Sequence, residues 1–188
     1  MECSKADGRE LWVLAEIYHV RKLKIWLIGE IDRDNVCAAY EFWLVPEGVE
    51  RNDIMERCSV LRCRGLEWVS DEGLKGVGVG AMKDFVLKRI GDRLDRFTGL
   101  GWRFGCGWSF VMEGFFFAER WLQVNGGAVG GPVYYQKIRA CIQVVEELDL
   151  MRLPLRVLKS VVRESGLVSD KRLVEMCESK MAAGMGSG

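Results

Sequence analysis

Residues 81–97, AMKDFVLKRIGDRLDRF, carry the clearest structural signal in the chain. Apolar residues recur there at steps of three and four, at Met82, Phe85, Val86, Ile90, Leu94 and Phe97. Such spacing places them on one face of an α-helix. The other face alternates acidic and basic side chains every four residues, at Asp84, Lys88, Asp92 and Arg96. Opposite charges at that spacing stabilise each other on a solvated surface, so the stretch predicts an amphipathic helix.

The chain before this helix has a pattern that favours β-strands. Residues 11–20, 22–31, 36–45 and 59–70 are rich in Ile, Val, Leu, Trp and Tyr, with partial alternation of facing residues. The segments between them are too short for crossover helices. Residues 1–72 therefore predict an antiparallel β-meander of about four strands. A helical turn is the alternative for Ile54–Cys58, and residues 71–80 form a glycine-rich joint.

Residues 99–124 allow two interpretations. A hairpin turning at Glu113–Gly114 would place seven aromatic residues on one face, at Trp102, Phe104, Trp108, Phe110, Phe115, Phe117 and Trp121. A helix from about Ser109 would instead align Val111, Met112, Phe115, Ala118 and Leu122, and Asn125–Gly126 would stop it. We favour the helix, because only Gly114 opposes it.

Three further helices are predicted after residue 131. Pro132 suits the first turn of a helix over 133–148, Pro154 begins one that ends near Glu164, and Ser169 with Asp170 caps one that reaches about Met181. Residues 183–188 read as a flexible tail. The sequence therefore predicts an α+β fold, in which the meander (1–72) and a helical half of four to five helices (81–182) pack as one compact domain.

Composition limits the class of protein. The chain has 188 residues, 27 Lys plus Arg against 27 Asp plus Glu, and 49% apolar residues. That balance excludes a largely disordered chain and disfavours a protein directed mainly at polyanions. No signal peptide or membrane span is apparent, which predicts a cytoplasmic protein, or a virion protein if the source is viral. The scarcity of Thr, His, Pro, Asn and Gln suggests a strand-skewed genome, such as that of a virus, and a hyperthermophilic source is a second expectation.

Motifs for catalysis, metals and cofactors are weak. The chain has one histidine, His19, and its seven cysteines form no Cys-x-x-Cys pair, so neither a zinc site nor a Cys–His nucleophile is indicated. The glycines at 73–80 lack the Gly-Lys-Ser or Gly-Lys-Thr of a phosphate loop. We therefore expect no enzyme activity, catalytic residue, metal, cofactor or small-molecule ligand.

Self-association is the first of two non-enzymatic functions that remain, and an enzyme that uses carboxylates is the third and least favoured alternative. Aromatic residues and Met are abundant, and the helix over 133–148 is apolar around much of its circumference. We expect a structural or accessory assembly protein that forms a homo-oligomer through Tyr134, Tyr135, Ile138, Ile142 and Val145.

The alternative is a single-stranded nucleic-acid-binding protein. In that case a basic stripe would contact phosphates, at Arg152, Arg156, Lys159 and Arg163. Bases would stack on aromatic residues beside two arginines, at Trp102, Trp108, Trp121, Arg103 and Arg120.

Overall fold

The fold is all-α across the residues that the structure, a computed structural model, describes: 5–44, 52–98, 107–127 and 131–185. No strand occurs among them, so the predicted α+β class and its β-meander are wrong. The chain divides into two compact units, residues 1–85 and 86–188, and the boundary lies inside one long helix.

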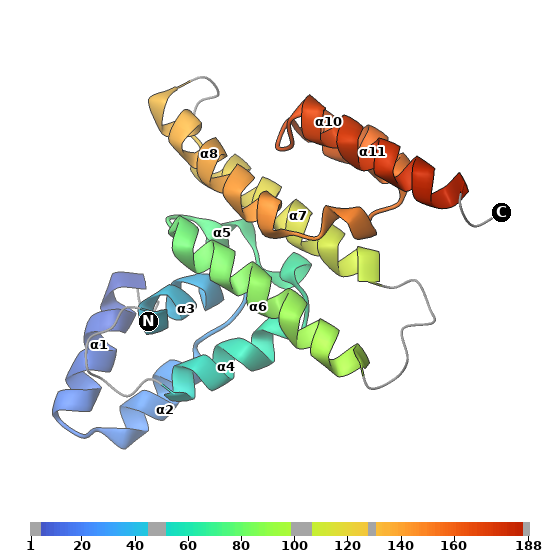
Figure 1. The fold of residues 1–188 in the computed structure, drawn as a ribbon. Coiled ribbons are helices and arrows are strands. Elements are labelled where there is room, and N and C mark those ends of the chain that lie inside the picture. The colour runs from blue at the N-terminus through green and yellow to red at the C-terminus, as the bar shows by residue number, and fades with distance from the viewer. Residues whose placement is uncertain (1–4, 45–51, 99–106, 128–130, 186–188) are drawn as a thin grey trace. The chain divides into compact units, whose positions relative to one another are not determined.

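The first unit is built from short helices. They are α1 (Lys5–Ile17), α2 (Arg21–Gly29), α3 (Val36–Leu44), α4 (Asn52–Arg62), the 3-10 turn η1 (Leu66–Trp68), α5 (Asp71–Leu74) and the start of α6 (Val79–Thr98). Helix α1 pairs with α2 and α3 pairs with α4, as Figure 1 shows. Helix α3 also packs on α5, and α2 contacts α4.

Burial explains why the predicted strands are helices. The buried residues of α4 are Ile54, Cys58, Leu61 and Arg62, at helical steps of four, three and one. Helix α3 likewise buries Val36, Cys37 and Tyr40. β-Branched and aromatic residues favour strands only weakly, and packing of one helical face overrides that preference. The helical alternative for 54–58 is confirmed, and it extends over the whole of α4.

Tyr40 stands at the centre of the first unit. Its hydroxyl donates a hydrogen bond to Asp84 of α6, and its ring meets Phe85 edge to face at 5.2 Å between centroids. The buried guanidinium of Arg62 lies 5.8 Å from the centroids of both rings. Burial is the main cause that raises the pKa of Tyr40, and its hydrogen bond to Asp84 is the second. Asp84, predicted on a solvated face, thus takes part in tertiary packing.

The glycine-rich joint at 71–80 is more ordered than predicted. Ser70 caps α5 by accepting a hydrogen bond from the backbone N–H of Gly73 at 3.1 Å. A Cβ on Gly73 would lie 2.4 Å from the carbonyl oxygen of Arg33, so only glycine allows the two segments to approach so closely.

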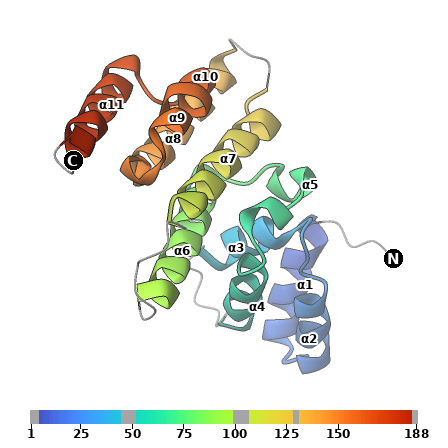
Figure 2. The ribbon, with the colours of Figure 1, turned by 90° about the vertical axis from the view of Figure 1, so that its right-hand side faces the viewer.

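The second unit contains the rest of α6, α7 (Gly107–Asn125), α8 (Pro132–Glu147), the 3-10 turn η2 (Leu150–Arg152), a helix over 155–165, and α11 (Asp170–Met185). The helix over 155–165 consists of α9 (Leu155–Val157), the π-helical segment η3 (Leu158–Val162) and α10 (Arg163–Ser165). Helix α7 lies along α8, and α11 packs on η3 (Figures 1 and 2).

The helical interpretation of residues 107–125 is confirmed, and the hairpin is excluded there. All five residues of the predicted stripe are buried, from Phe115 and Ala118 at 0% exposed to Met112 at 8%. Gly114 is also explained, because a Cβ there would meet the side-chain tips of Ile90 and Val86 at 3.0 Å. The Cys141 thiol of α8 donates to the Ala118 carbonyl of α7 at 3.2 Å, which joins the two helices.

The predicted helix ends of the second unit are confirmed. Pro132 occupies the first turn of α8, and Gly166, with φ of 68°, ends the helix over 155–165. The Ser169 hydroxyl accepts from the backbone N–H of Arg172 at the start of α11. The tail prediction is wrong for 183–185, which extend α11, and residues 186–188 lie outside the described part.

Candidate interaction surface

The turn between α1 and α2 is a Schellman motif, the hydrogen-bonded turn that commonly ends a helix. The N–H of Val20 donates to the carbonyl of Ala15 at 2.8 Å, and the N–H of His19 donates to Glu16 at 3.2 Å. His19 occupies the left-handed position, with φ of 53°, where glycine is usual. The predicted strand position of His19 is therefore wrong, and the turn folds α2 back along α1.

Few of the described side chains of this hairpin are buried. Trp12 and Ala15 of α1 are buried, at 3% and 0% exposed. Lys24 of α2 forms an ion pair with Glu16 and lies 5.9 Å from the centroid of the Trp12 ring. Leu23, Leu27 and Ile28 of α2 are half-buried, so these contacts leave Ile25 and Trp26 as the exposed apolar residues of α2.

The outer side of the hairpin is apolar. Side chains exposed by 43% to 71% gather within thirteen residues, at Leu14, Ile17, Tyr18, Val20, Ile25 and Trp26. Helix α2 has five apolar residues among its nine, RKLKIWLIG, yet none of its residues is buried. Six large side chains of roughly 200 Å² each, about half exposed, present on the order of 600 Å². We call these six residues the hairpin surface.

The charges at the start of α2 are basic, and one acid, the exposed Glu30, follows its end. Arg21 and Lys22 are exposed and form no ion pair within the described part of the chain, and α2 contains no acidic residue. Gly29 continues the face formed by Lys22, Ile25 and Trp26, at steps of three, one and three. The outer face of α2 thus combines an apolar centre with a basic end.

The residues predicted for self-association on α8 are divided by burial. Tyr135 is 60% exposed, whereas Val145 is fully buried. Tyr134, Ile138 and Ile142 are half-buried. The N-terminal half of α8 therefore offers an apolar edge, and Val145 belongs to the core with Cys141 and Val144.

The basic stripe predicted for nucleic acid is exposed, whereas the aromatic part is only partly accessible. Arg156, Lys159 and Arg163 are exposed and form no ion pair among the described residues, and Arg152 pairs with Asp149 at 2.7 Å. Trp121 is fully buried under Lys137, whose ammonium lies 4.9 Å from the ring centroid. Its ring is therefore covered.

The other aromatic and arginine residues of that prediction are less informative. Trp108 is 39% exposed and Arg120 is half-buried. Trp102 and Arg103 lie outside the described residues.

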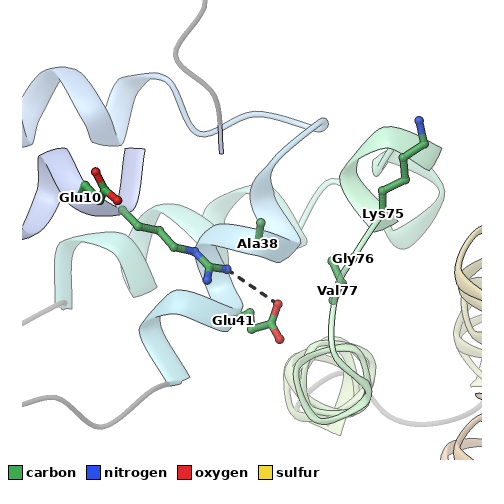
Figure 3. A pocket seen from close by; sticks show the side chains of 7 residues that line it. Glu10, Ala38, Glu41, Lys75, Gly76 and Val77 are labelled. Carbon is green, nitrogen blue, oxygen red and sulfur yellow. Dashed lines mark ion pairs between the residues drawn. The ribbon is translucent and has the colours of Figure 1, made fainter. Parts of the chain in front are cut away.

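A hollow of about 410 Å³ lies between α1, α3 and the segment after α5 (Figure 3). Its lining residues are Arg9, Glu10, Ala38, Glu41, Lys75, Gly76 and Val77. Glu41 pairs with Arg9 at 3.9 Å and accepts the N–H of Gly78 at 3.1 Å. Lys75 points away from Glu41 and pairs with Glu72, a contact that raises its pKa. Three of the four charged lining residues, Arg9, Glu41 and Lys75, are thus engaged in ion pairs, so the lining holds no cluster of free charges that would bind a ligand.

The cysteines of the described residues are free thiols, and four of the five are buried: Cys37, Cys58, Cys141 and Cys177. Burial raises the pKa of Cys58 to about 12, and burial followed by the charge of Glu119 raises that of Cys141 to about 12. Both thiols therefore stay protonated at neutral pH and behave as small apolar groups.

Three further observations concern metal sites, membrane-spanning helices and similarity to known proteins. Within the described residues, no group of three or more His, Cys, Asp or Glu side chains is arranged to hold a metal ion. No helix among them has both the length and the apolar character needed to cross a membrane. Comparison of the chain with protein families, curated proteins and solved structures found no match.

Proposed function

We propose that the protein is a non-catalytic assembly protein that self-associates through the hairpin surface. The observation that carries this proposal is α2, a mostly apolar helix without a single buried residue. A helix of this composition is normally covered on at least one side, because exposed apolar surface is unfavourable in water. An uncovered apolar patch bordered by charges is typical of a protein interface.

The size of the hairpin surface supports a specific interface. Its exposed area, on the order of 600 Å², approaches the roughly 800 Å² that each partner contributes to a standard complex. Tyr18 and Trp26 are the residue types that most often dominate binding energy. Aliphatic residues such as Ile17 and Ile25 favour a protein partner, because nucleic-acid sites rely on aromatic stacking and cationic contacts.

The test compares the mass of the wild-type protein with that of Ile25→Glu by sedimentation velocity. Ile25 is 60% exposed, so the substitution leaves the folded chain intact but places a carboxylate inside the interface. An uncompensated buried charge costs roughly 3 kcal/mol or more, which weakens association by more than about a hundredfold.

Val60→Glu is the matched control, since Val60 is 55% exposed on α4 of the same unit, outside the hairpin surface. We expect the control to associate as the wild type does. Equal association of wild type and Ile25→Glu would refute the proposal.

A second candidate function is binding of a polyanion by the helix over 155–165. Arg156, Lys159 and Arg163 favour it, because all three are exposed and without an ion pair among the described residues. Three phosphate contacts would give weak binding that decreases steeply with salt. A labelled single-stranded oligonucleotide should then shift at about 50 mM salt and be released at higher salt, and the triple substitution to Gln should abolish the shift.

A further inference from the structure

The outer face of α11 has the chemistry that complements α2. Leu173, Met176 and Cys177 point into the core, whereas Val174 and Met181 are 54% and 40% exposed. Glu175 and Glu178 lie on the same outer face as these two, at helical steps of one, three and three. Neither carboxylate forms an ion pair within the described residues.

From this pairing of features we infer that α2 of one copy docks on α11 of a second copy, head to tail. This inference rests on the proposed self-association and specifies its geometry. In α2, Ile25 and Trp26 lie one turn after the cations Arg21 and Lys22. In α11, the apolar side chains Val174 and Met181 enclose the two acids. The distance from Val174 to Met181 along the helix is about 10 Å, as is that from Lys22 to Gly29 in α2. Apolar residues would meet apolar residues, and the basic end would meet Glu175 or Glu178.

Val133, Tyr135 and Met151, which are also exposed in the second unit, fit α2 less well. Val133 and Tyr135 of α8 have Lys137 and Arg139 as their nearest charged neighbours in sequence, and these repel the basic end of α2. Met151 adjoins Arg152. Like charges brought together in an interface cost binding energy and exclude wrong partners. The outer face of α11 offers exposed apolar side chains beside two acids and one base, Lys171, so it is acidic on balance.

A contact between two different faces has a structural consequence. Each chain carries both halves of the interface, so its own α2 and its own α11 each remain available for another copy. Such heterologous contacts build rings or open chains of subunits, whereas a face that binds itself stops at a dimer. The inferred contact therefore predicts assemblies larger than a dimer at high protein concentration.

The test mixes two variants that each lack one face. Ile25→Glu disables α2 and keeps α11, and Val174→Glu disables α11 and keeps α2. Each variant alone should be a monomer by sedimentation velocity, because neither has a complete pair of faces. Their mixture should form a 1:1 dimer, in which the intact α11 of one variant binds the intact α2 of the other. Val60→Glu, which adds a charge to neither face, is the control and should assemble alone as the wild type does.

The outcomes separate this inference from the proposed function. If Val174→Glu assembles like the wild type, or the mixture stays monomeric while the wild type associates, the inference fails and self-association through α2 stands. A wild type that remains monomeric overturns both. If that monomer binds an oligonucleotide and Ile25→Glu does not, the hairpin surface is a nucleic-acid site, and the inferred contact is likewise overturned.

Discussion

Replacing Glu113 by Gln should destabilise the second unit by about 3 kcal/mol, the lower end of what loss of one partner in a buried ion pair costs. The Arg89 side chain is only 4% exposed and Glu113 is 15% exposed, and Nε of Arg89 lies 3.2 Å from Oε1 of Glu113. Glutamine keeps the shape and one acceptor oxygen but removes the charge. The guanidinium would then remain buried without its counter-charge, which is the source of the cost.

Urea unfolding followed by circular dichroism measures this loss. The chain has two compact units, so two transitions are expected, and only the one that belongs to the second unit should move. Glu164→Gln, at an exposed residue of α10, is the control and should change stability by less than about 0.5 kcal/mol.

The double variant Arg89→Met with Glu113→Leu should recover most of the loss, because an apolar pair of similar volume often replaces a buried ion pair at little cost. A loss below about 1 kcal/mol for Glu113→Gln would refute the reasoning, since it would mean that Arg89 does not depend on this carboxylate. A double variant as unstable as the single one would do the same.

Three further changes have defined outcomes. His19→Gly should stabilise the first unit by about 0.5–1 kcal/mol in thermal unfolding, because it relieves the left-handed conformation; an unchanged or lower melting temperature would contradict this. Gly114→Leu should cost about 2 kcal/mol or more by crowding Ile90 and Val86, and a neutral result would show that α7 has room there. Cys58 and Cys141 should resist a thiol reagent at pH 8. Because their pKa rises from 9.0 to about 12 on folding, the unfolded chain loses these protons first, and stability should decrease from pH 9 towards pH 12; no decrease in melts over that range would refute the assignment.

Sequence patterns predicted the second unit well because its helices are long and have clear ends. Helix α6 has twenty residues and α7 nineteen, enough for several turns of regular spacing. Pro132, Gly166 and Ser169 mark helix ends through backbone chemistry that does not depend on tertiary structure. Local signals and tertiary packing agree there, so the sequence is sufficient.

The first unit was misread because its helices are short and one lacks a buried face. Helix α2 has apolar residues on all sides, so Leu23, Ile25 and Leu27 imitate the alternation of a strand. The Schellman turn at His19 was also hidden, since glycine is the usual residue in that position. Only the folded structure shows that α2 contacts α1 through Lys24 and leaves Ile25 and Trp26 exposed.

The candidate site was predicted in part. The exposure of Arg156, Lys159 and Arg163 follows from helical spacing opposite the buried Leu158 and Val162. Burial of Trp121 does not follow from sequence, because it depends on the packing of α8 against α7. The sequence predicts two strands over residues 11–31, and that interpretation does not reveal the hairpin surface. The signal that could have revealed it is α2, a nine-residue apolar segment without periodicity.

Hydrogen exchange of the wild-type protein at low and high concentration tests most directly whether another copy covers α2. Backbone amides exchange more slowly where a partner excludes water and reduces local opening, and exchange resolves such protection segment by segment. We predict that peptides covering residues 14–29 exchange more slowly as concentration rises, whereas those covering α4 do not change. Identical exchange of residues 14–29 at both concentrations, with the mass constant at 21.3 kDa, would contradict the account.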